Sequence, residues 1–314
     1  MKPMYMLQSE GEIPKSCRDY LAALTCKEST KRGIVWQLET LLCFIAERGI
    51  GKFGQLTITI IEEFFKREYE RRRKRSNPLC RNTVIYVRQY LSFLYRQQKI
   101  DFNPSVTLFT PAAQHKNAPV CFTEQEMQAI IFVIDRASIK GKRDYAILII
   151  ASHTGLRCCD IIDLCFEDID WQRLEIHLNQ SKTGKQINLP IDREVATALS
   201  DYILHARPET EDRHIFIRIQ KPYRGMQSTG SGNNIMLAYV KKAGIHYRPF
   251  DGKRFHALRR TLASNMLAQS IPLTTISQVL GHSDMDSAKA YLSLSHSELS
   301  LCCFSLAPFL KARE

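Results

Sequence analysis

The sequence predicts a mainly α-helical protein with one small antiparallel β-sheet, organised as two domains. Over most of the 314 residues, apolar side chains recur at the spacing of amphipathic helices. Strict alternation replaces this spacing only in residues 169–190, where it predicts a β-hairpin. Three prolines in residues 101–121 indicate a linker. We therefore expect a helical domain at 1–108, a linker at 109–122 and a helix-rich domain that contains the sheet at 123–314, with a C-terminal tail from about residue 295.

Four helices are expected in the first domain, after a loose leader of residues 1–13. The clearest apolar stripe belongs to the last of them and consists of Val84, Val87, Tyr90, Leu91 and Leu94. The expected starts are Ile13, the capping pair Ser29-Thr30, Thr57 or Thr59 (with the helix from Ile60), and the capping pair Asn82-Thr83. The second helix is expected to end at Gly49 and the third near Lys74.

The second domain begins with the capping box Thr123-Glu124-Gln125-Glu126, which predicts a helix to about Ala137. A strongly apolar stretch, 142–153, predicts a buried helix that Thr154-Gly155-Leu156-Arg157 interrupts. The hairpin has Leu174, Ile176 and Leu178 on one face and turns at residues 182–185. The remaining expectations are helices at 158–164, 192–206 and 236–243, strands at 166–169 and 214–219, and a flexible loop at 224–234.

The charge balance favours a polyanionic partner. The formal net charge is +12, and residues 1–110 carry 19 Lys and Arg against 11 Asp and Glu. Nucleic acid is the commonest polyanion that such proteins bind. The densest basic run gives the candidate DNA-binding residues Arg71, Arg72, Arg73, Lys74 and Arg75. The same run also suits a solvated helix end, which is the usual place of a charge run.

Cysteine usage and hydropathy exclude several classes of protein. None of the ten cysteines forms a C-x-x-C pair, so neither a zinc site nor a disulfide framework is predicted. The N-terminus lacks the apolar core of a signal peptide, and no apolar run approaches the length of a membrane span. We expect a cytoplasmic protein with reduced thiols and no membrane partner. No clustered carboxylates suggest a metal site, and no motif indicates a cofactor.

The stretch 253–294 carries side chains suited to holding a phosphate and attacking it. It contains His256, Arg259, His282 and Tyr291 within three short helical patterns. A guanidinium can hold two phosphate oxygens bidentately, which a lysine cannot do as well. Arg259 lies three residues after His256, so both lie on one helix face, and Arg260 falls on a similar face.

Five short motifs follow one another along the chain. They are T-G-L-R at 154–157, N-Q-S-K-T-G-K at 179–185, H-A-L-R-R at 256–260, L-G-H at 280–282 and A-Y-L at 290–292. Together they resemble the motifs of the tyrosine recombinase (phage integrase) family. The motifs follow the family's order and cover roughly residues 123–294. Simple two-domain members, of the Xer type or encoded by transposons, are the most similar kind.

The resemblance implies a fold and a set of catalytic residues. The fold is an N-terminal four-helix core-binding (SAM-like) domain followed by an α+β catalytic domain. The catalytic residues would be Arg157, Lys182, His256, Arg259, His282 and Tyr291, with Asp160 orienting active-site groups. Tyr291 would be the nucleophile, His256 the candidate proton acceptor, and Lys182 the general acid, with Lys185 as the alternative. Only the family pattern selects Arg259 over Arg260.

The resemblance also implies an activity and its partners. Site-specific recombination would proceed through a 3′-phosphotyrosyl intermediate, without a metal or cofactor, on double-stranded DNA that carries a specific site. A homo-tetramer would act on two duplexes, for integration or excision of a mobile element or for resolution of DNA molecules. A tail stripe of Leu299, Cys302, Cys303 and Leu306 suits docking on a neighbouring subunit or on its own domain. The alternatives are a type IB topoisomerase and a non-catalytic DNA-binding protein.

Overall fold

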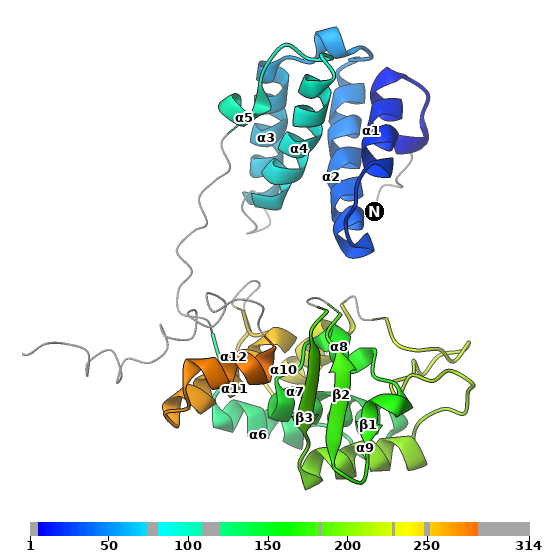
Figure 1. The fold of residues 1–314 in the computed structure, drawn as a ribbon, viewed down its shortest axis with the longest axis vertical. Coiled ribbons are helices and arrows are strands. Elements are labelled where there is room, and N and C mark those ends of the chain that lie inside the picture. The colour runs from blue at the N-terminus through cyan, green and yellow to red at the C-terminus, as the bar shows by residue number, and fades with distance from the viewer. Residues whose placement is uncertain are drawn as a thin grey trace, which may run out of the picture. The chain divides into compact units, whose positions relative to one another are not determined.

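A computed structural model describes residues 6–73, 81–108, 120–181, 184–227, 230–247 and 252–281, apart from the side chains of Ser29 and Arg73. The chain forms two compact units, residues 1–115 and 116–314, and each is considered by itself. Both are mainly helical, and the second contains a three-stranded antiparallel sheet (Figure 1). The predicted fold class is therefore confirmed.

The first unit is built from helices around one apolar core. Its elements are η1 (Met6–Gln8), α1 (Glu12–Ala22), α2 (Glu28–Glu47), η2 (Phe53–Gln55), α3 (Ile58–Arg73), α4 (Arg81–Arg96) and α5 (Pro104–Thr107). All five residues of the predicted stripe on α4 are buried. Four of them, all except Val84, pack with residues of α2 and α3 such as Leu38, Leu41 and Phe64.

Several boundaries in the first unit differ from the expectation. Residues 6–8 are not a loose leader, because the backbone N–H groups of Met6 and Leu7 donate to the buried carboxylate of Glu39 at 3.2 and 2.9 Å. Lys27, rather than the pair Ser29-Thr30, stands at the N-cap of α2. The third helix begins two residues before Ile60. Part of the proline-containing stretch 101–121 is helical: Asn103 caps α5, accepting the N–H of Ser105 at 3.0 Å.

The second unit places its sheet among helices. Its elements are α6 (Glu124–Phe132), α7 (Ile139–Thr154), α8 (Cys158–Ile162), η3 (Phe166–Asp168), β1 (Ile169–Asp170), β2 (Glu175–Asn179), β3 (Gln186–Pro190), α9 (Arg193–His205), α10 (Ser231–Lys242), α11 (Phe255–Ala268) and α12 (Leu273–Leu280). The strands pair in the order β1-β2-β3 (Figure 1). Ile176 lies opposite Leu189 and Leu178 opposite Ile187, and all four side chains are buried. The predicted hairpin is confirmed, with Leu174 in the turn before β2.

Helix α7 is the most deeply buried helix of the described part of this unit. Residues 145–151 are all buried, and the helix packs against α9 and α11. The capping box of α6 is present, but α6 ends at Phe132 rather than Ala137. In the first turn of α7, a Cβ on Gly141 would lie 1.7 Å from the carbonyl oxygen of Asp135, so glycine permits the close approach of the connecting turn. None of the helices in the described ranges is both long and apolar enough to cross a membrane.

Three further expectations for this unit are wrong. Residues 214–219 form no named strand, since His214 and Ile217 make only isolated bridges to Cys165 and Gly225. Helix α10 begins at Ser231, so the end of the expected loop 224–234 is helical. A Cβ on Gly232 would lie 2.3 Å from the sulfur of Cys158, which shows that this glycine permits close packing. Residues 166–168 form a 3₁₀ helix, so the strand expected at 166–169 begins only at Ile169, where β1 completes the three-stranded sheet.

Asp144 on α7 anchors a buried polar cluster. It is fully buried and accepts hydrogen bonds from the Arg143 guanidinium at 2.8 and 3.1 Å, and from the Tyr239 hydroxyl at 3.1 Å. Lys140 also pairs with it. Burial, followed by the nearby Asp144, raises the pKa of Tyr239 above its usual value.

We expect Asp144→Ala to lower the free energy of unfolding by about 3–5 kcal/mol, because it leaves the buried Arg143 charge without its carboxylate. Urea denaturation of the full chain measures this loss. The control is Asp201→Ala, which removes the partly exposed pair with Lys142 and should cost about 0–1 kcal/mol. Equal losses for the two variants would contradict the assignment of Asp144 as the anchor.

Candidate active site

The turn after α7 positions the first candidate arginine. Gly155 ends the helix with φ of 64°, in the left-handed region. A Cβ there would lie 2.7 Å from Leu280 Cδ2 and 2.9 Å from Leu262 Cδ2. Both the backbone conformation and the close approach therefore require glycine. The turn buries Leu156 and leaves Arg157 at the N-cap of α8.

Arg157 is held by an amide on the sheet. Its Nη1 donates to Gln180 Oε1 at 2.7 Å and lies 3.9 Å from Asp160 Oδ2. The side chain is only 15% exposed. The short contact is with a neutral oxygen, so it orients the guanidinium without cancelling its charge.

Asp160 connects α8 to the β2–β3 turn. Its buried Oδ1 accepts the backbone N–H and the hydroxyl of Ser181, at 2.9 and 2.5 Å. Ser181 directly precedes Lys182, which lies outside the described residues. The expected role of Asp160 in orienting neighbouring groups stays a prediction. Its hydrogen bonds to Ser181 are the contacts through which it would orient the β2–β3 turn.

Helix α11 presents Arg259 and Arg260 in different directions. Arg259 is 2% exposed, and its Nη1 and Nη2 donate to the carbonyl oxygens of Gly155 and Leu280 at 2.8 and 2.5 Å. Arg260 instead donates to the carbonyls of Val120 and Gly252 at 3.1 and 2.5 Å. The structure therefore brings Arg259, and not Arg260, into the group of contacts that holds Arg157. His256 lies on the same helix and is exposed.

Gln180 was not identified from the sequence. It is 1% exposed, and its Nε2 donates to Leu280 O at 3.2 Å, so one carbonyl accepts from both Gln180 and Arg259. The alternation Ile176, Leu178, Gln180 indicates that this amide points inward with two buried side chains. The hairpin pattern therefore predicts an inward-facing side chain at position 180, whereas the motif resemblance selects only Lys182.

Several candidate residues cannot be placed. Lys182, His282, Tyr291, Lys74, Arg75, the Arg73 side chain and the tail from residue 295 lie outside what the structure describes. Lys185, the alternative acid, is exposed after the turn, and its carbonyl accepts the N–H of Gln180 at 2.9 Å.

Two of the basic-run residues have a carboxylate partner in the first unit. Arg71 and Arg72 contact Glu68 Oε2 at 2.6 and 3.5 Å, and Glu68 is 3% exposed. Arg71 is 42% exposed at its side chain, whereas Arg72 is 14% exposed. Of the two, Arg71 is better placed to meet a phosphate, and DNA contact by this run stays a prediction.

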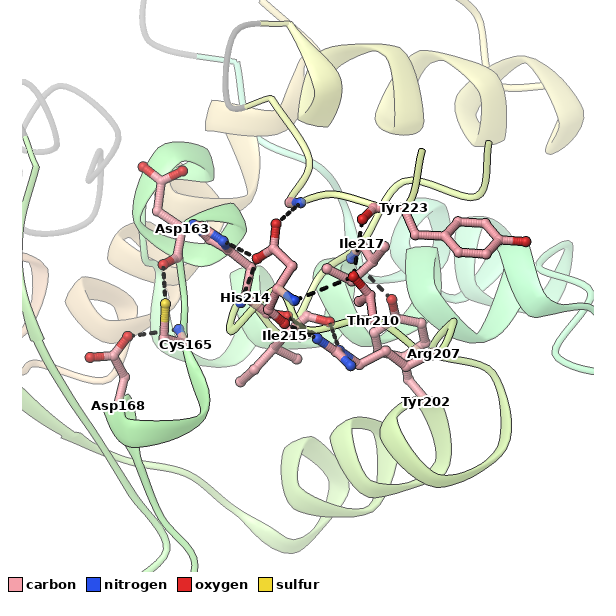
Figure 2. Close-up of polar contacts among 12 residues, drawn as sticks. Asp163, Cys165, Asp168, Tyr202, Arg207, Thr210, His214, Ile215, Ile217 and Tyr223 are labelled. Atoms are coloured by element: carbon pink, nitrogen blue, oxygen red, sulfur yellow. Dashed lines mark hydrogen bonds and ion pairs between the residues drawn. The ribbon is translucent and has the colours of Figure 1, made fainter. Parts of the chain in front are cut away.

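A second basic segment follows α9 and is held by an internal polar network. Figure 2 shows Arg207 pointing at the backbone of His214 and Ile215, whose carbonyls it contacts at 2.8 and 3.1 Å. Asp212 accepts the N–H groups of His214 and Gly225 at 3.0 and 2.7 Å. The backbone N–H of His214, followed by that of Gly225, lowers the pKa of Asp212 to about 2.

The formal charges after Asp212 are all positive over the next 35 residues. Residues 213–247 contain six Lys and Arg and no Asp or Glu. Arg213, Lys221 and Arg224 are exposed. A tethered backbone with exposed cations fits contact with a polyanion, and a count of charges in windows along the sequence would have found it.

Comparison with known proteins identifies a family. Residues 121–298 match the model of the "Phage integrase family". The chain is 28% identical to "Putative integrase/recombinase y4rA" of Sinorhizobium fredii over 241 residues, which are 76% of this chain and 56% of that protein. It is 26% identical to "Tyrosine recombinase XerC" of Bacillus pumilus over 284 residues, 86% and 87% of the two chains. It thus spans little more than half the length of the first relative.

The fold is also similar to that of a solved integrase structure. The crystal structure of a lambda integrase tetramer bound to a Holliday junction matches with a TM-score of 0.66 and 19% sequence identity. The match covers 89% of this chain and 76% of that one. At this identity the likeness shows the fold alone.

We expect Asp212→Asn to destabilise the protein in a pH-dependent way. Because the pKa of Asp212 in the folded protein, about 2, is below its ordinary value of 3.8, the carboxylate stabilises the fold above that ordinary value. This contribution is lost as the pH falls toward 2. Urea denaturation from pH 6 to pH 2.5 should show that the difference in the free energy of unfolding between wild type and variant becomes smaller as the pH falls. Glu211→Gln, at an exposed neighbour, is the control, and a gap independent of pH would contradict the assignment.

Proposed function

The chain belongs to the phage integrase family, and on this premise we propose that it is a site-specific DNA recombinase that cuts and rejoins strands through a tyrosine nucleophile. One observation carries the proposal. Two arginines 102 positions apart, Arg157 and Arg259, are held in a common set of hydrogen bonds by the Gln180 amide and the carbonyl oxygens of Gly155 and Leu280. Such a pair is suited to a phosphodiester, whose negative charge grows in the pentavalent transition state.

The arginines would act as a preorganised clamp. Hydrogen bonds to the carbonyls of Gly155 and Leu280 fix the plane of the Arg259 guanidinium, and Gln180 does the same for Arg157. Fixed donors require little reorganisation when charge develops on the phosphate. Removing one such donor from an enzyme typically costs about 10²–10³ in rate.

The remaining roles follow the family pattern. The Tyr291 oxygen would attack phosphorus while its proton passes to His256, forming a phosphotyrosyl ester at the 3′ end. The bond to the 5′ oxygen would break, and Lys182 would give that oxygen a proton to produce a 5′-hydroxyl. His282 would donate a hydrogen bond to a phosphate oxygen. Attack by a 5′-hydroxyl on the ester reverses the steps, so rejoining needs no external energy source.

Neither a metal nor a cofactor is part of this proposal. The two guanidinium groups would supply the positive charge, and His256 and Lys182 would move the protons. Among the residues that the structure describes, no group of three or more His, Cys, Asp or Glu side chains is arranged to hold a metal. The direct test is activity in a chelator, which is included below.

The proposed partner is double-stranded DNA with a specific site, bound by a homo-tetramer on two duplexes. Exchange between two duplexes requires cleavage of four strands, and one nucleophile per subunit gives four subunits. Lambda integrase, whose fold is similar, has been solved as a tetramer bound to a Holliday junction. Arg71 in the first unit, and Arg213, Lys221 and Arg224 in the second, are the described cations that we propose contact phosphates.

The tail is proposed to join the subunits. The stripe of Leu299, Cys302, Cys303 and Leu306 needs an apolar acceptor. A cavity of about 740 Å³ on the second unit has apolar residues such as Met127, Ile131 and Leu262 among those that line it. The tail of a neighbouring subunit in this cavity would hold the assembly together. The similarity to an integrase/recombinase and to a tyrosine recombinase fits integration or excision of a mobile element, or resolution of DNA molecules.

We expect wild-type protein to form a covalent complex with a nicked suicide duplex that carries its own target site, in buffer with EDTA. Loss of the short strand below the nick prevents rejoining and traps the tyrosyl ester. Tyr291→Phe should form none, because it lacks the attacking oxygen. Denaturing gel electrophoresis of labelled DNA measures the complex.

Each contrary result has a distinct meaning. A covalent complex with Tyr291→Phe would reject Tyr291 as the nucleophile. A complex that forms with Mg²⁺ but not with EDTA would reject the metal-free mechanism. Relaxation of non-specific supercoiled plasmid by monomers would favour a type IB topoisomerase. Binding to the site without any covalent complex would favour a non-catalytic DNA-binding protein.

We expect the adjacent arginines on α11 to respond differently to the same change. Arg259→Lys should lower the cleavage rate by about 10²–10³-fold, because a lysine cannot reproduce the oriented guanidinium. Arg260→Lys, the matched control, should keep the rate within about threefold, since it loses only contacts to Val120 and Gly252. Single-turnover cleavage of the suicide duplex gives both rates. Comparable losses at the two positions would show that the contacts of Arg259 have no special part in cleavage.

A further inference from the structure

We propose that Gln180 is a positioning residue for strand cleavage, holding Arg157 in the orientation in which its guanidinium meets the scissile phosphate. The inference rests on the proposed function and deepens it, because it makes the contact between Gln180 and Arg157 a determinant of the cleavage rate.

Both ends of the Gln180 amide are used. Oε1 accepts from Arg157 Nη1 at 2.7 Å, and Nε2 donates to Leu280 O at 3.2 Å. The side chain is 1% exposed. Rotation of the amide by a half turn would place its NH₂ against the guanidinium and its oxygen against a carbonyl, losing both hydrogen bonds. The amide is therefore fixed in one orientation, and Arg157 is fixed with it.

The contacts of Gln180 belong to a closed ring. Arg157 donates to Gln180, which donates to Leu280 O; Arg259 donates to the same carbonyl and also to Gly155 O. Gly155 is two residues before Arg157, so the backbone closes the ring. Within this ring Gln180 is the side chain that connects the two arginines across the sheet and α12. Their mutual spacing is therefore set by an amide as well as by the packing of helices.

Two glycines make room for the ring. Gly155 allows Leu280 to approach the turn before Arg157, as described above. Gly281 ends α12 with φ of 62°, and a Cβ there would lie 2.5 Å from Gln180 Nε2. The conformation and the space at Gly281 both suit an amide that reaches the Leu280 carbonyl. Three motifs far apart in the sequence, T-G-L-R, Q-S-K and L-G-H, thus meet at Gln180.

The base of the hairpin turn is fixed at the same residue. The Gln180 N–H donates to Lys185 O at 2.9 Å, and Gly184 N–H donates to Gln180 O at 2.7 Å. The next residue, Ser181, is bound by Asp160 through two hydrogen bonds. Gln180 therefore has a backbone that closes the turn and a side chain that orients Arg157. A substitution at its side chain tests the second part while leaving the first in place.

Gln180→Met is the variant that separates orientation from packing. Methionine is of similar length and fits beside the buried Ile176 and Leu178, but it makes neither hydrogen bond. We expect the single-turnover cleavage rate to fall about 10–100-fold, since a misplaced catalytic group commonly costs this much. Affinity for the uncleaved duplex should stay within about twofold. Gln172→Met makes the same change at an exposed glutamine in the β1–β2 turn. It should alter neither the cleavage rate nor the affinity for the duplex.

A double-mutant cycle tests whether Gln180 acts through Arg157. Arg157→Lys keeps a charge but cannot hold the phosphate as an oriented guanidinium. In that background Gln180→Met should slow cleavage by less than about threefold, because the group that it orients is already gone. If Gln180 had a purely structural role, Gln180→Met would slow cleavage by the same factor in wild type and in Arg157→Lys. The melting temperature would fall in both.

The experiment uses the full chain and a nicked duplex with its own site. That site is found first, by sequencing genomic DNA fragments of the encoding organism that stay attached to wild-type protein after treatment with SDS. The role of Gln180 would be overturned if Gln180→Met cleaved at the wild-type rate, or if it slowed cleavage equally in wild type and in Arg157→Lys. Either result would leave the proposed function standing. Absence of any attached DNA with wild-type protein would overturn the proposed function, and this inference with it.

Discussion

The carbonyl oxygen of Leu280 is the acceptor on which the candidate site depends. It lies in the last turn of α12, where backbone carbonyls have no partner within the helix. The partial negative charge of a helix C-terminus attracts cations, and Gly281 turns the chain away so that side chains can reach the oxygen. Arg259 and Gln180 both donate to it. A local property of a helix end thereby fixes two side chains that come from different parts of the sequence.

The acceptors of Arg259 also explain how a buried arginine can serve a phosphate. Arg143 is buried beside the carboxylate of Asp144, and Arg72 lies against the buried Glu68, so their charges are largely balanced within the protein. Arg259 donates to the carbonyl oxygens of Gly155 and Leu280, which orient its guanidinium. Burial in a low-dielectric site then strengthens the attraction to an incoming anion.

Features with a local cause could be predicted from the sequence, and features with a tertiary cause could not. The stripe on α4, the capping box of α6 and the alternation of β2 and β3 depend on spacing within a few residues, and all are present. The end of α6 and the start of α10 differ from the expectation, and near them Gly141 and Gly232 pack closely against Asp135 and Cys158, contacts that no local pattern shows. Gln180 depends on a carbonyl 100 residues away, whose proximity no local pattern shows.

The choice between Arg259 and Arg260 shows what each kind of reasoning contributes. Helical spacing gives the two residues neighbouring directions, and charge is identical, so the residues alone leave both open. Packing separates them: Arg259 turns into the space between the α7 turn and the end of α12, and Arg260 ties α11 to the backbone at Val120 and Gly252. The resemblance to the family selects the same residue without using these contacts. Two independent arguments thus reach Arg259, one from motif order and one from hydrogen-bond geometry.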